Sequence, residues 1–185
     1  MKTLRVAFTG HRPNKLGGYD LSNPLNRKII KEIRNIVCDL LNDDKYYNYH
    51  FITGGAIGVD QIAYSIVHIY KICNNITQEI AIPFKKQPDK WISKKDIYTY
   101  YHQIESADKV TYVDELPEYN THTTPIGEFS VMKAHIRNHY MVDNCDILIA
   151  VWDGSPSGTK NCIDYAKKLG KKIIYIRVDK LRRNL

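Results

Sequence analysis

Three short segments of the 185-residue chain combine glycine with polar side chains directly after an apolar, strand-like run. Glycine permits tight turns and close approach of the backbone to a ligand, and free amides at a helix start attract anions. In open parallel sheets such turns gather at the carboxyl ends of the strands, where ligands bind. The sequence therefore predicts one shared ligand site, formed by Gly10, His11, Arg12, Thr53, Gly54, Gly55, Ala56, Gly58, Asp60, Asp153, Gly154, Ser157, Gly158 and Thr159.

Each turn offers a different chemical group. In the first, Arg12 can hold a phosphate or carboxylate through two parallel hydrogen bonds, and His11 can donate, accept or titrate near neutral pH. In the second, Asp60 can cap a helix, hold a ribose hydroxyl or bind a cation-associated ligand. In the third, the hydroxyls of Ser157 and Thr159 suit a phosphate or a ribose. The second turn matches neither the GxGxxG fingerprint nor the Walker sequence, so neither a standard dehydrogenase nor ATP hydrolysis is inferred.

A fourth contribution comes from the helix predicted before the third turn. Arg137 and Met141 are four residues apart and share a face, so the arginine would be backed by an apolar neighbour. Asn138 follows it and joins the predicted ligand-binding set. An exposed Arg137 with a structural role is the alternative interpretation. Three aromatic side chains are candidates for stacking on a base, with a place in the core as the alternative for each: Phe84, Trp91 and Trp152.

Regular elements must position these groups. Apolar runs alternate with amphipathic stretches and predict strands near residues 4–9, 49–53, 79–82, 109–113, 147–152 and 172–177. Helices are predicted at about 24–41, 59–73, 90–105, 127–144 and 158–169. This succession of βα units indicates an α/β fold, a three-layer Rossmann-like domain with a mostly parallel central sheet. The length favours one domain spanning residues 1–185.

Composition excludes several classes of protein. No apolar run approaches the roughly 18 residues that span a bilayer, and the first residues lack the features of a signal peptide, so a cytoplasmic protein without a membrane partner is expected. The four cysteines are scattered, so neither a disulfide framework nor a metal site is predicted. The irregular stretch 114–125 is interpreted as an exposed loop, either a lid or plain surface irregularity.

The net charge of +7 invites a nucleic-acid hypothesis. The basic residues are spread over many helix faces, however, and the densest cluster lies between residues 167 and 183. A solvated, fraying tail explains that cluster as well as a nucleic-acid contact does.

Taken together, these segments resemble the SLOG superfamily, a Rossmann-like group that includes the Lonely Guy phosphoribohydrolases, DNA-processing protein A and the YpsA-like proteins. The resemblance is strongest to the YpsA-like branch and runs in order through residues 9–13, 53–60, 82–87 with Trp91, 146–154 and 158–159. It implies a nucleotide-related ligand: a mononucleotide, an ADP-ribose-like compound or a cyclic nucleotide. Because related proteins often form dimers, it also implies a homo-oligomer. No cofactor is predicted.

The Lonely Guy enzymes cleave a nucleoside monophosphate between base and ribose phosphate. Arg137, Met141 and Asp146 reproduce the spacing of one of their motifs. In the next motif those enzymes place a catalytic Glu three positions after a Thr, where this chain has Cys162. Cleavage of an N-glycosidic bond needs a carboxylate, so this departure counts against hydrolysis. Candidates for a catalytic role are Arg137, Asp60, Asp153 and Glu128.

The leading hypothesis is therefore a module that binds a nucleotide-type ligand at the carboxyl edge of the sheet, with sequestering or sensing of that ligand as its candidate roles. The first alternative is a nucleoside 5′-monophosphate phosphoribohydrolase or related N-glycosidase. The second is a protein that binds single-stranded DNA, in keeping with the basic charge.

Overall fold

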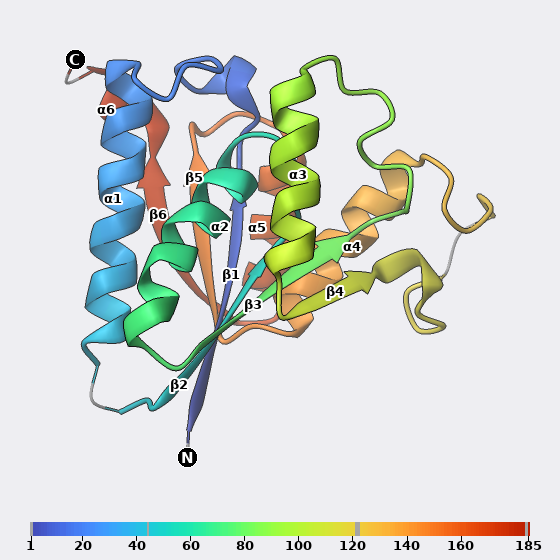
Figure 1. Cartoon of the computed structure of the whole chain (residues 1–185), viewed down its shortest axis with the longest axis horizontal. Helices are drawn as coiled ribbons and strands as arrows, with labels where there is room; N and C mark the ends of the chain where they lie inside the picture. Colours follow the sequence, from blue (N-terminus) through green and yellow to red (C-terminus); the bar gives the residue numbers. More distant parts are fainter. Residues whose placement is uncertain (1, 44, 121–122, 184) are drawn as a thin grey trace.

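The computed structural model describes residues 2–43, 45–120, 123–183 and 185. Its centre is a six-stranded sheet in the order β4-β3-β2-β1-β5-β6, in which every neighbouring pair is parallel (Figure 1). The strands are β1 (Thr3–Gly10), β2 (Asn48–Thr53), β3 (Ile76–Ile82), β4 (Lys109–Tyr112), β5 (Ile147–Trp152) and β6 (Lys172–Arg177).

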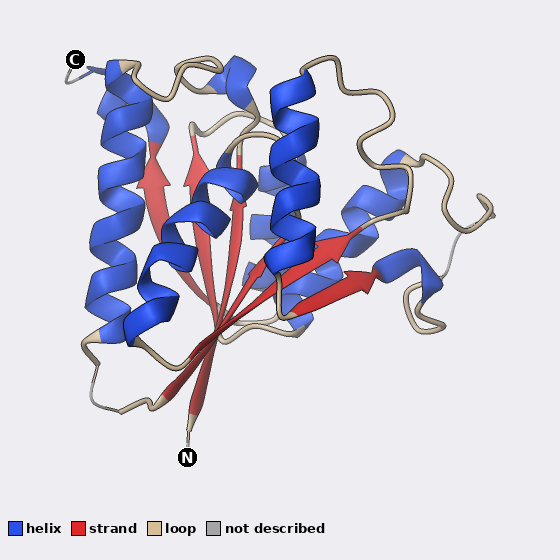
Figure 2. Cartoon of the chain, in the orientation of Figure 1, coloured by secondary structure: helices blue, strands red, loops and turns tan. Residues whose placement is uncertain are grey.

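Helices cover both faces of this sheet, which gives the three layers of a Rossmann-like α/β fold (Figure 2). On one face lie α1 (Pro24–Leu41), α2 (Val59–Tyr70), α3 (Lys94–Ser106) and α6 (Val178–Arg183). On the other lie α4 (Val131–Asp143) and α5 (Gly158–Lys168). Three short 3-10 helices complete the set: η1 (Pro13–Lys15), η2 (Lys71–Cys73) and η3 (Val113–Glu115).

Strand β1 shows why the sheet is covered on both sides. Leu4, Val6 and Phe8 belong to the apolar cluster under α1, α2 and α6, whereas Ala7 belongs to the cluster under α4 and α5. Successive side chains of a strand point to opposite faces, so a central parallel strand must be apolar at nearly every position. The pattern fixes β1 at the middle of the molecule.

Two predicted helices begin later than the sequence pattern suggests. Helix α3 starts at Lys94, not Lys90, because the hydroxyl of Ser93 accepts the amide of Asp96 at 3.3 Å and caps the helix there. Helix α4 starts at Val131, not Gly127. Gly127 has a φ of +84° and its amide donates to Asp114 at 2.8 Å, so it cannot continue a right-handed helix.

The end of the basic cluster, for which the sequence left a fraying tail and a nucleic-acid contact as alternatives, forms a helix that packs on the domain. Residues 178–183 form α6, where Val178 is buried and Leu181 packs against the cluster under α1. The predicted loop 114–125 includes residues 121 and 122, which lie outside the described part of the chain; its start folds into η3. No helix in the described ranges is both long and apolar enough to cross a membrane.

The order of strands creates a topological switch point. After β1 the chain builds β2, β3 and β4 on one side and then returns to place β5 on the other side of β1. The connections leaving the carboxyl ends of β1 and β5 therefore diverge. In open α/β sheets this divergence leaves a crevice, and ligands bind there.

Candidate functional site

A cavity of about 510 Å³ lies at this switch point, within the range typical of small-molecule sites. It extends from the segment after β3, past the ends of β2 and β1, to the amino terminus of α5. The structure thus brings together side chains that are far apart in the sequence. Of the predicted site residues, those that line it are Gly10, His11, Arg12, Ala56, Asp60, Arg137, Asn138, Ser157, Gly158 and Thr159.

The other predicted ligand-binding residues do not line the cavity. They are Thr53, Gly54, Gly55, Gly58, Asp153 and Gly154. Three of the six lie directly behind its walls: Gly54 supports Arg137, Gly58 supports the first turn, and Asp153 holds His11. Their place in the structure is one of support for the groups that face the cavity.

Two glycines are required by close approach. A Cβ atom at Gly54 would lie 1.6 Å from Nη1 of Arg137, so only glycine admits the guanidinium there. Gly58 has a φ of +107°, and a Cβ atom on it would lie 2.5 Å from the carbonyl oxygen of His11. The glycines of the second turn therefore let α4 and the first turn approach the end of β2.

Arg137 is a buried cation at the floor of the cavity, only 8% exposed, which excludes the alternative of an exposed structural arginine. Its Nη1 donates to the carbonyl oxygens of Gly54 and Ala81, and lies 3.9 Å from Oδ2 of Asp60. Asp60 accepts the amide of Ala56 at 3.3 Å. Burial raises the pKa of Asp60 above its ordinary value, against the opposing charge of Arg137.

The amino terminus of α5 forms the wall beside β1. The hydroxyl of Ser157 accepts the amide of Lys160 at 3.2 Å, so one amide of the first turn is satisfied by the cap. The amides of Gly158 and Thr159 have no acceptor within the helix. Asn138 of α4 donates to the Gly158 carbonyl at 3.1 Å and fixes this end of α5 against α4.

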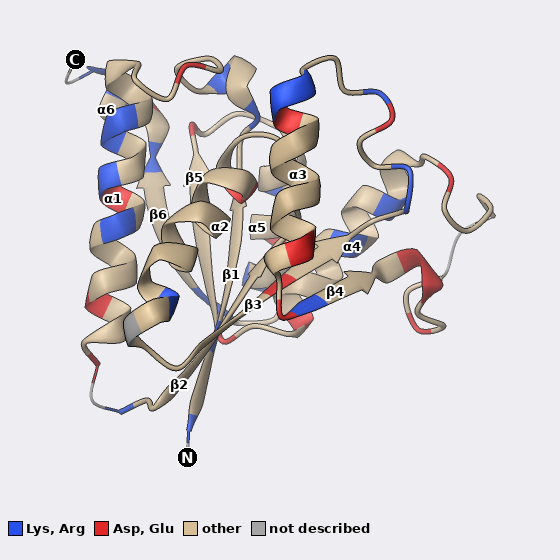
Figure 3. Ribbon diagram, viewed as in Figure 1, with Lys and Arg blue, Asp and Glu red and all other residues tan. Residues whose placement is uncertain are grey.

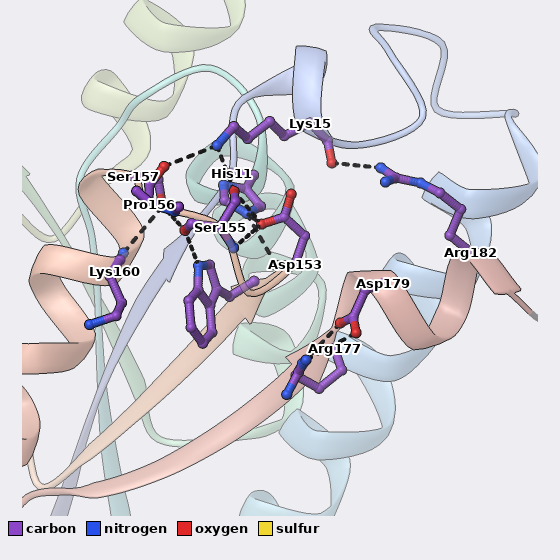
Figure 4. A network of polar contacts seen from close by, with 11 residues as sticks. His11, Lys15, Asp153, Ser155, Pro156, Ser157, Lys160, Arg177, Asp179 and Arg182 are labelled. Atoms are coloured by element: carbon purple, nitrogen blue, oxygen red, sulfur yellow. Dashed lines mark hydrogen bonds and ion pairs between the residues drawn. The ribbon is translucent and has the colours of Figure 1, made fainter.

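A polar network joins the first and third turns (Figure 4). Nε2 of His11 lies 2.7 Å from Oδ1 of Asp153, and that same oxygen accepts the amide and hydroxyl of Ser155. Lys15 donates to the Ser155 hydroxyl at 2.7 Å, and Arg182 of α6 donates to the Lys15 carbonyl at 3.1 Å. The network holds the loop that leads into α5 against the end of β1.

The two titratable groups of this network, His11 and Asp153, both have shifted pKa values. Burial lowers the pKa of His11 more than the adjacent Asp153 raises it. Burial by itself would raise the pKa of Asp153, but hydrogen bonds from Ser155 and His11 outweigh it and hold that pKa well below its usual range. Near neutral pH the pair is therefore a neutral imidazole beside a carboxylate.

Sequence reasoning missed several residues of the cavity. Phe129 and Lys90 are the clearest: the Lys90 ammonium lies 3.9 Å from the centre of the Phe129 ring, and that ring meets Phe84 edge to face at 5.5 Å. In the structure both lie in irregular segments just before α3 and α4, whereas the sequence pattern places them inside helices at 90–105 and 127–144, which hid their position at the cavity. Phe84 and Trp91 line the cavity as stacking candidates, whereas Trp152 lies outside the lining and donates to the Ser155 carbonyl.

Comparison with known proteins decides the family. The YpsA model, described as the YspA SLOG family, matches residues 6–181, nearly the whole chain. The chain belongs to the YspA SLOG family. The resemblance identified from the glycine-containing turns is thereby confirmed.

Two relatives show how far the similarity reaches. The chain is 39% identical over 149 residues to the SPbeta prophage-derived protein YoqJ of Bacillus subtilis (strain 168), which covers 80% of this chain and 85% of that protein. It is 25% identical over 168 residues to a UPF0398 protein of Bacillus thuringiensis (strain Al Hakam), covering 90% and 84% respectively. The similarity therefore covers most of this chain and most of both relatives.

Solved structures of DNA processing protein A (DprA) have the same fold. The Streptococcus pneumoniae protein superposes with a TM-score of 0.59 at 15% identity over 94% of this chain. The Helicobacter pylori protein, whose structure is described for its single-stranded DNA binding mode, gives 0.56 at 16% identity over 93%. This chain spans 50% of the first and 64% of the second. At these identities the likeness is one of fold.

Two features associated with the Lonely Guy motifs can now be located. Arg137 and Met141 line the cavity, whereas Asp146 accepts the amide of Arg5 at 2.8 Å and lies outside the lining. Cys162 is fully buried outside the lining, and burial raises the pKa of its thiol to about 12. The thiol is therefore neutral near pH 7 and replaces no carboxylate.

The three candidate carboxylates also divide into those that line the cavity and those that do not. Of the three, Asp60 alone lines the cavity. Glu128 forms an ion pair with Lys86 at 2.6 Å, and Asp153 is held behind His11. Asp60 beside Arg137 is therefore the candidate carboxylate best placed to meet a ligand, and His11 also lines the cavity.

Proposed function

We propose that this protein binds a nucleotide-type ligand, such as a mononucleotide, an ADP-ribose-like compound or a cyclic nucleotide, in the cavity at the switch point. The observation that carries the proposal is the division of the cavity into two chemically different ends. Arg12, Lys15 and the first amides of α5 lie at one end, and the aromatic rings of Phe84 and Phe129 lie at the other. A nucleotide has the same division, with a phosphate at one end and a base at the other.

The spacing of the sheet supports this orientation. The aromatic end follows β3 and the cationic end adjoins β1 and β5, which are up to three strand positions from β3. Strands lie about 4.8 Å apart, so the two ends are separated by roughly 14 Å or less. That distance suits an extended nucleotide. Asp60, which accepts the amide of Ala56 after β2, lies between the two ends, where a ribose would offer its hydroxyls.

The cations at the phosphate end are available for a ligand. Among the described residues, no carboxylate lies within ion-pair distance of Arg12 or Lys15. Lys15 makes its contacts with neutral oxygens of Ser155 and Pro156. A phosphate here would gain charge-assisted hydrogen bonds without first breaking an ion pair.

Two measurements test the proposal. Mass spectrometry of the solution left after denaturing the purified protein should identify a released phosphorylated compound, and calorimetric titration with AMP, ADP-ribose and cyclic dinucleotides should give saturable binding. The Arg12→Gln variant should weaken that binding about tenfold, since a charge-assisted hydrogen bond is lost. Arg183→Gln, an exposed arginine of α6 outside the cavity, is the matched control. Absence of saturable binding across the panel would end the proposal.

Single-stranded DNA is the second candidate ligand. It is favoured by the shared fold of the Helicobacter pylori protein, described for binding such DNA, and by the net charge of +7. A 20-nucleotide oligomer that binds this protein, while AMP and ADP-ribose fail to compete, would select this function.

Turnover is the third candidate, and it rests on Asp60. A buried carboxylate with a raised pKa is suited to give a proton to a leaving base. Release of adenine from AMP, abolished by Asp60→Asn with AMP binding retained, would show that the site hydrolyses its ligand.

A single domain and a homo-oligomer stay predictions. Limited proteolysis tests the first, and light scattering tests the second.

A further inference from the structure

One side chain of the cavity wall carries an unused hydrogen-bond acceptor. Gln87 follows β3, lines the cavity and is only 8% exposed. Its Nε2 donates to the carbonyl oxygen of Gly54 at 3.2 Å. Among the described residues, its Oε1 has no hydrogen-bond partner and is shielded from water.

The orientation of this amide is fixed by its partner. A carbonyl oxygen can only accept, so the NH₂ group of Gln87 must face Gly54 and Oε1 must face the other way. The same Gly54 carbonyl accepts from Arg137, which anchors both side chains to one point. A buried acceptor without a donor is unfavourable, so a ligand that supplies the donor gains affinity.

The place of Gln87 identifies which part of a nucleotide it would meet. Gln87 belongs to the same segment as Phe84 and Trp91. Its backbone N–H donates to the Phe84 carbonyl at 3.1 Å. It therefore lies at the aromatic end, away from Arg12 and the start of α5. The donors that adenine and cytosine present there are their exocyclic amino groups, whereas hypoxanthine and uracil present only a ring N–H beside a carbonyl oxygen.

We propose that Gln87 selects nucleotides whose base carries an exocyclic amino group, which donates to Oε1 of Gln87. The inference rests on the proposed nucleotide-binding function and narrows its ligand class. Hypoxanthine and uracil carry a carbonyl oxygen in the position of that amino group, so their nucleotides would bring two acceptors together. Because Oε1 is shielded in the structure described, its contact with a base seated against the aromatic rings requires a change of the Gln87 rotamer on binding, of the kind that is common at binding sites.

Calorimetric titration with two matched pairs tests this selection: AMP against IMP, and CMP against UMP. The nucleotide with the amino group should bind the native protein more tightly than its partner by about tenfold or more. This ratio corresponds to the cost of leaving the Gln87 acceptor unpaired in the other complex. Gln87→Met keeps the length of the side chain and removes its acceptor. In that variant AMP should weaken to the level of IMP, while IMP binds as it does to the native protein.

Gln103→Met is the control, because Gln103 of α3 is also buried with an unpartnered Oε1 and lies outside the cavity. It should keep the preference for AMP and CMP. Equal binding of both members of each pair overturns the selection and leaves the proposed function standing. An equal loss for both members in Gln87→Met also overturns it. If none of the four nucleotides binds, the proposed function and this inference fall together. If Gln87→Met fails to fold, the titrations of the native protein with the two nucleotide pairs still test the selection.

Discussion

At the scale of single residues, Arg137 is the group on which the cavity floor depends. It is buried, and its neighbours at hydrogen-bond or ion-pair distance are the carbonyls of Gly54 and Ala81, the Asn138 side chain and Asp60. Two of these partners are backbone carbonyls, so the backbone itself helps to hold the buried cation in place. The same guanidinium reaches the cavity, so it links stability to binding.

The ion pair of Arg137 and Asp60 predicts a measurable coupling. Arg137→Met should lower the free energy of unfolding by about 3 kcal/mol or more, because the Asp60 carboxylate is left buried beside unpaired carbonyls. Asp60→Asn in the same chain should recover at least about 1 kcal/mol by removing that charge. Urea denaturation of both single variants and the double variant measures the coupling. Strictly additive losses would contradict it.

Gly54 supports a second prediction at this scale. Gly54→Ala should destabilise the protein by about 1–3 kcal/mol and weaken nucleotide binding, because the added methyl group occupies the place of the Arg137 guanidinium. Gly158→Ala is the matched control, since a Cβ atom there meets nothing within 4 Å. Thermal unfolding of both variants provides the comparison. A Gly54→Ala protein as stable as Gly158→Ala would show that Arg137 tolerates displacement.

At the scale of elements, α4 and α5 begin at serine residues that differ in their bonds. Ser157 caps α5 through its hydroxyl, whereas Ser130 at the start of α4 makes no such bond. Ser157→Ala should therefore cost about 1 kcal/mol of stability and Ser130→Ala close to none. Chemical denaturation of the two variants measures the difference. An equal cost would show that the Ser157 cap contributes nothing to α5.

The burial of His11, whose contact with Asp153 ties the end of β1 to the end of β5, predicts a loss of stability in acid. The unfolded chain takes up a proton on His11 near pH 6.5, whereas the folded form resists until a lower pH, so stability falls as the pH drops through that interval. Asp153 adds a second loss below about pH 3.8, because its folded pKa is depressed.

Melting temperatures recorded from pH 7.5 down to pH 4 check the first of these losses. His11→Gln should flatten the decline just below pH 6.5, since glutamine does not titrate. Ser22→Ala, in the loop before α1 and outside both turns, should leave the decline unchanged. A His11→Gln protein with the native pH profile would place the titrating group elsewhere.

The elements that local pattern determines were predictable from the sequence, and those that depend on distant contacts were not. The spacing of Ile29, Ile33 and Val37 predicts α1 correctly, and the structure buries all three. Helix α4 was predicted too long because the residue that stops it, Gly127, is held by Asp114 across a loop. Helix α6 was missed because a short basic segment at the end of a chain has no distinctive periodicity.

The candidate site divides in the same way. Glycine turns marked the backbone that surrounds the cavity, because a glycine after a strand has a local signature. The pairing of His11 with Asp153 joins residues 142 positions apart and leaves no trace in either segment. The sequence marks Gln87 only as part of a family motif and predicts no role for it. Its unpartnered amide oxygen can be recognised only once the surrounding chain is folded.

At the scale of the whole molecule, the net charge of +7 is dispersed. Along the ribbon, Lys and Arg positions are interspersed with Asp and Glu positions in α1, α3 and the loops (Figure 3). A protein that tracks a polynucleotide backbone needs a basic groove along several phosphates. Arg12, Lys15 and Lys90 instead gather at one cavity, which suits a ligand with few phosphates.

This distribution predicts how binding responds to salt. A nucleotide whose phosphates are held by Arg12 and Lys15 releases few counterions, so its logarithmic salt slope should have a magnitude of about 2 or less. A single strand that contacts six or more phosphates would give a magnitude near 4 or above, because each contact adds about 0.7. Titrations between 50 and 300 mM NaCl with ADP-ribose and with a 20-nucleotide oligomer measure both slopes. If the oligomer binds more tightly and with the steeper slope, surface cations beyond the cavity must contribute, and single-stranded DNA becomes the principal ligand. If only ADP-ribose binds, with a shallow slope that Arg12→Gln reduces further, the cavity alone accounts for recognition.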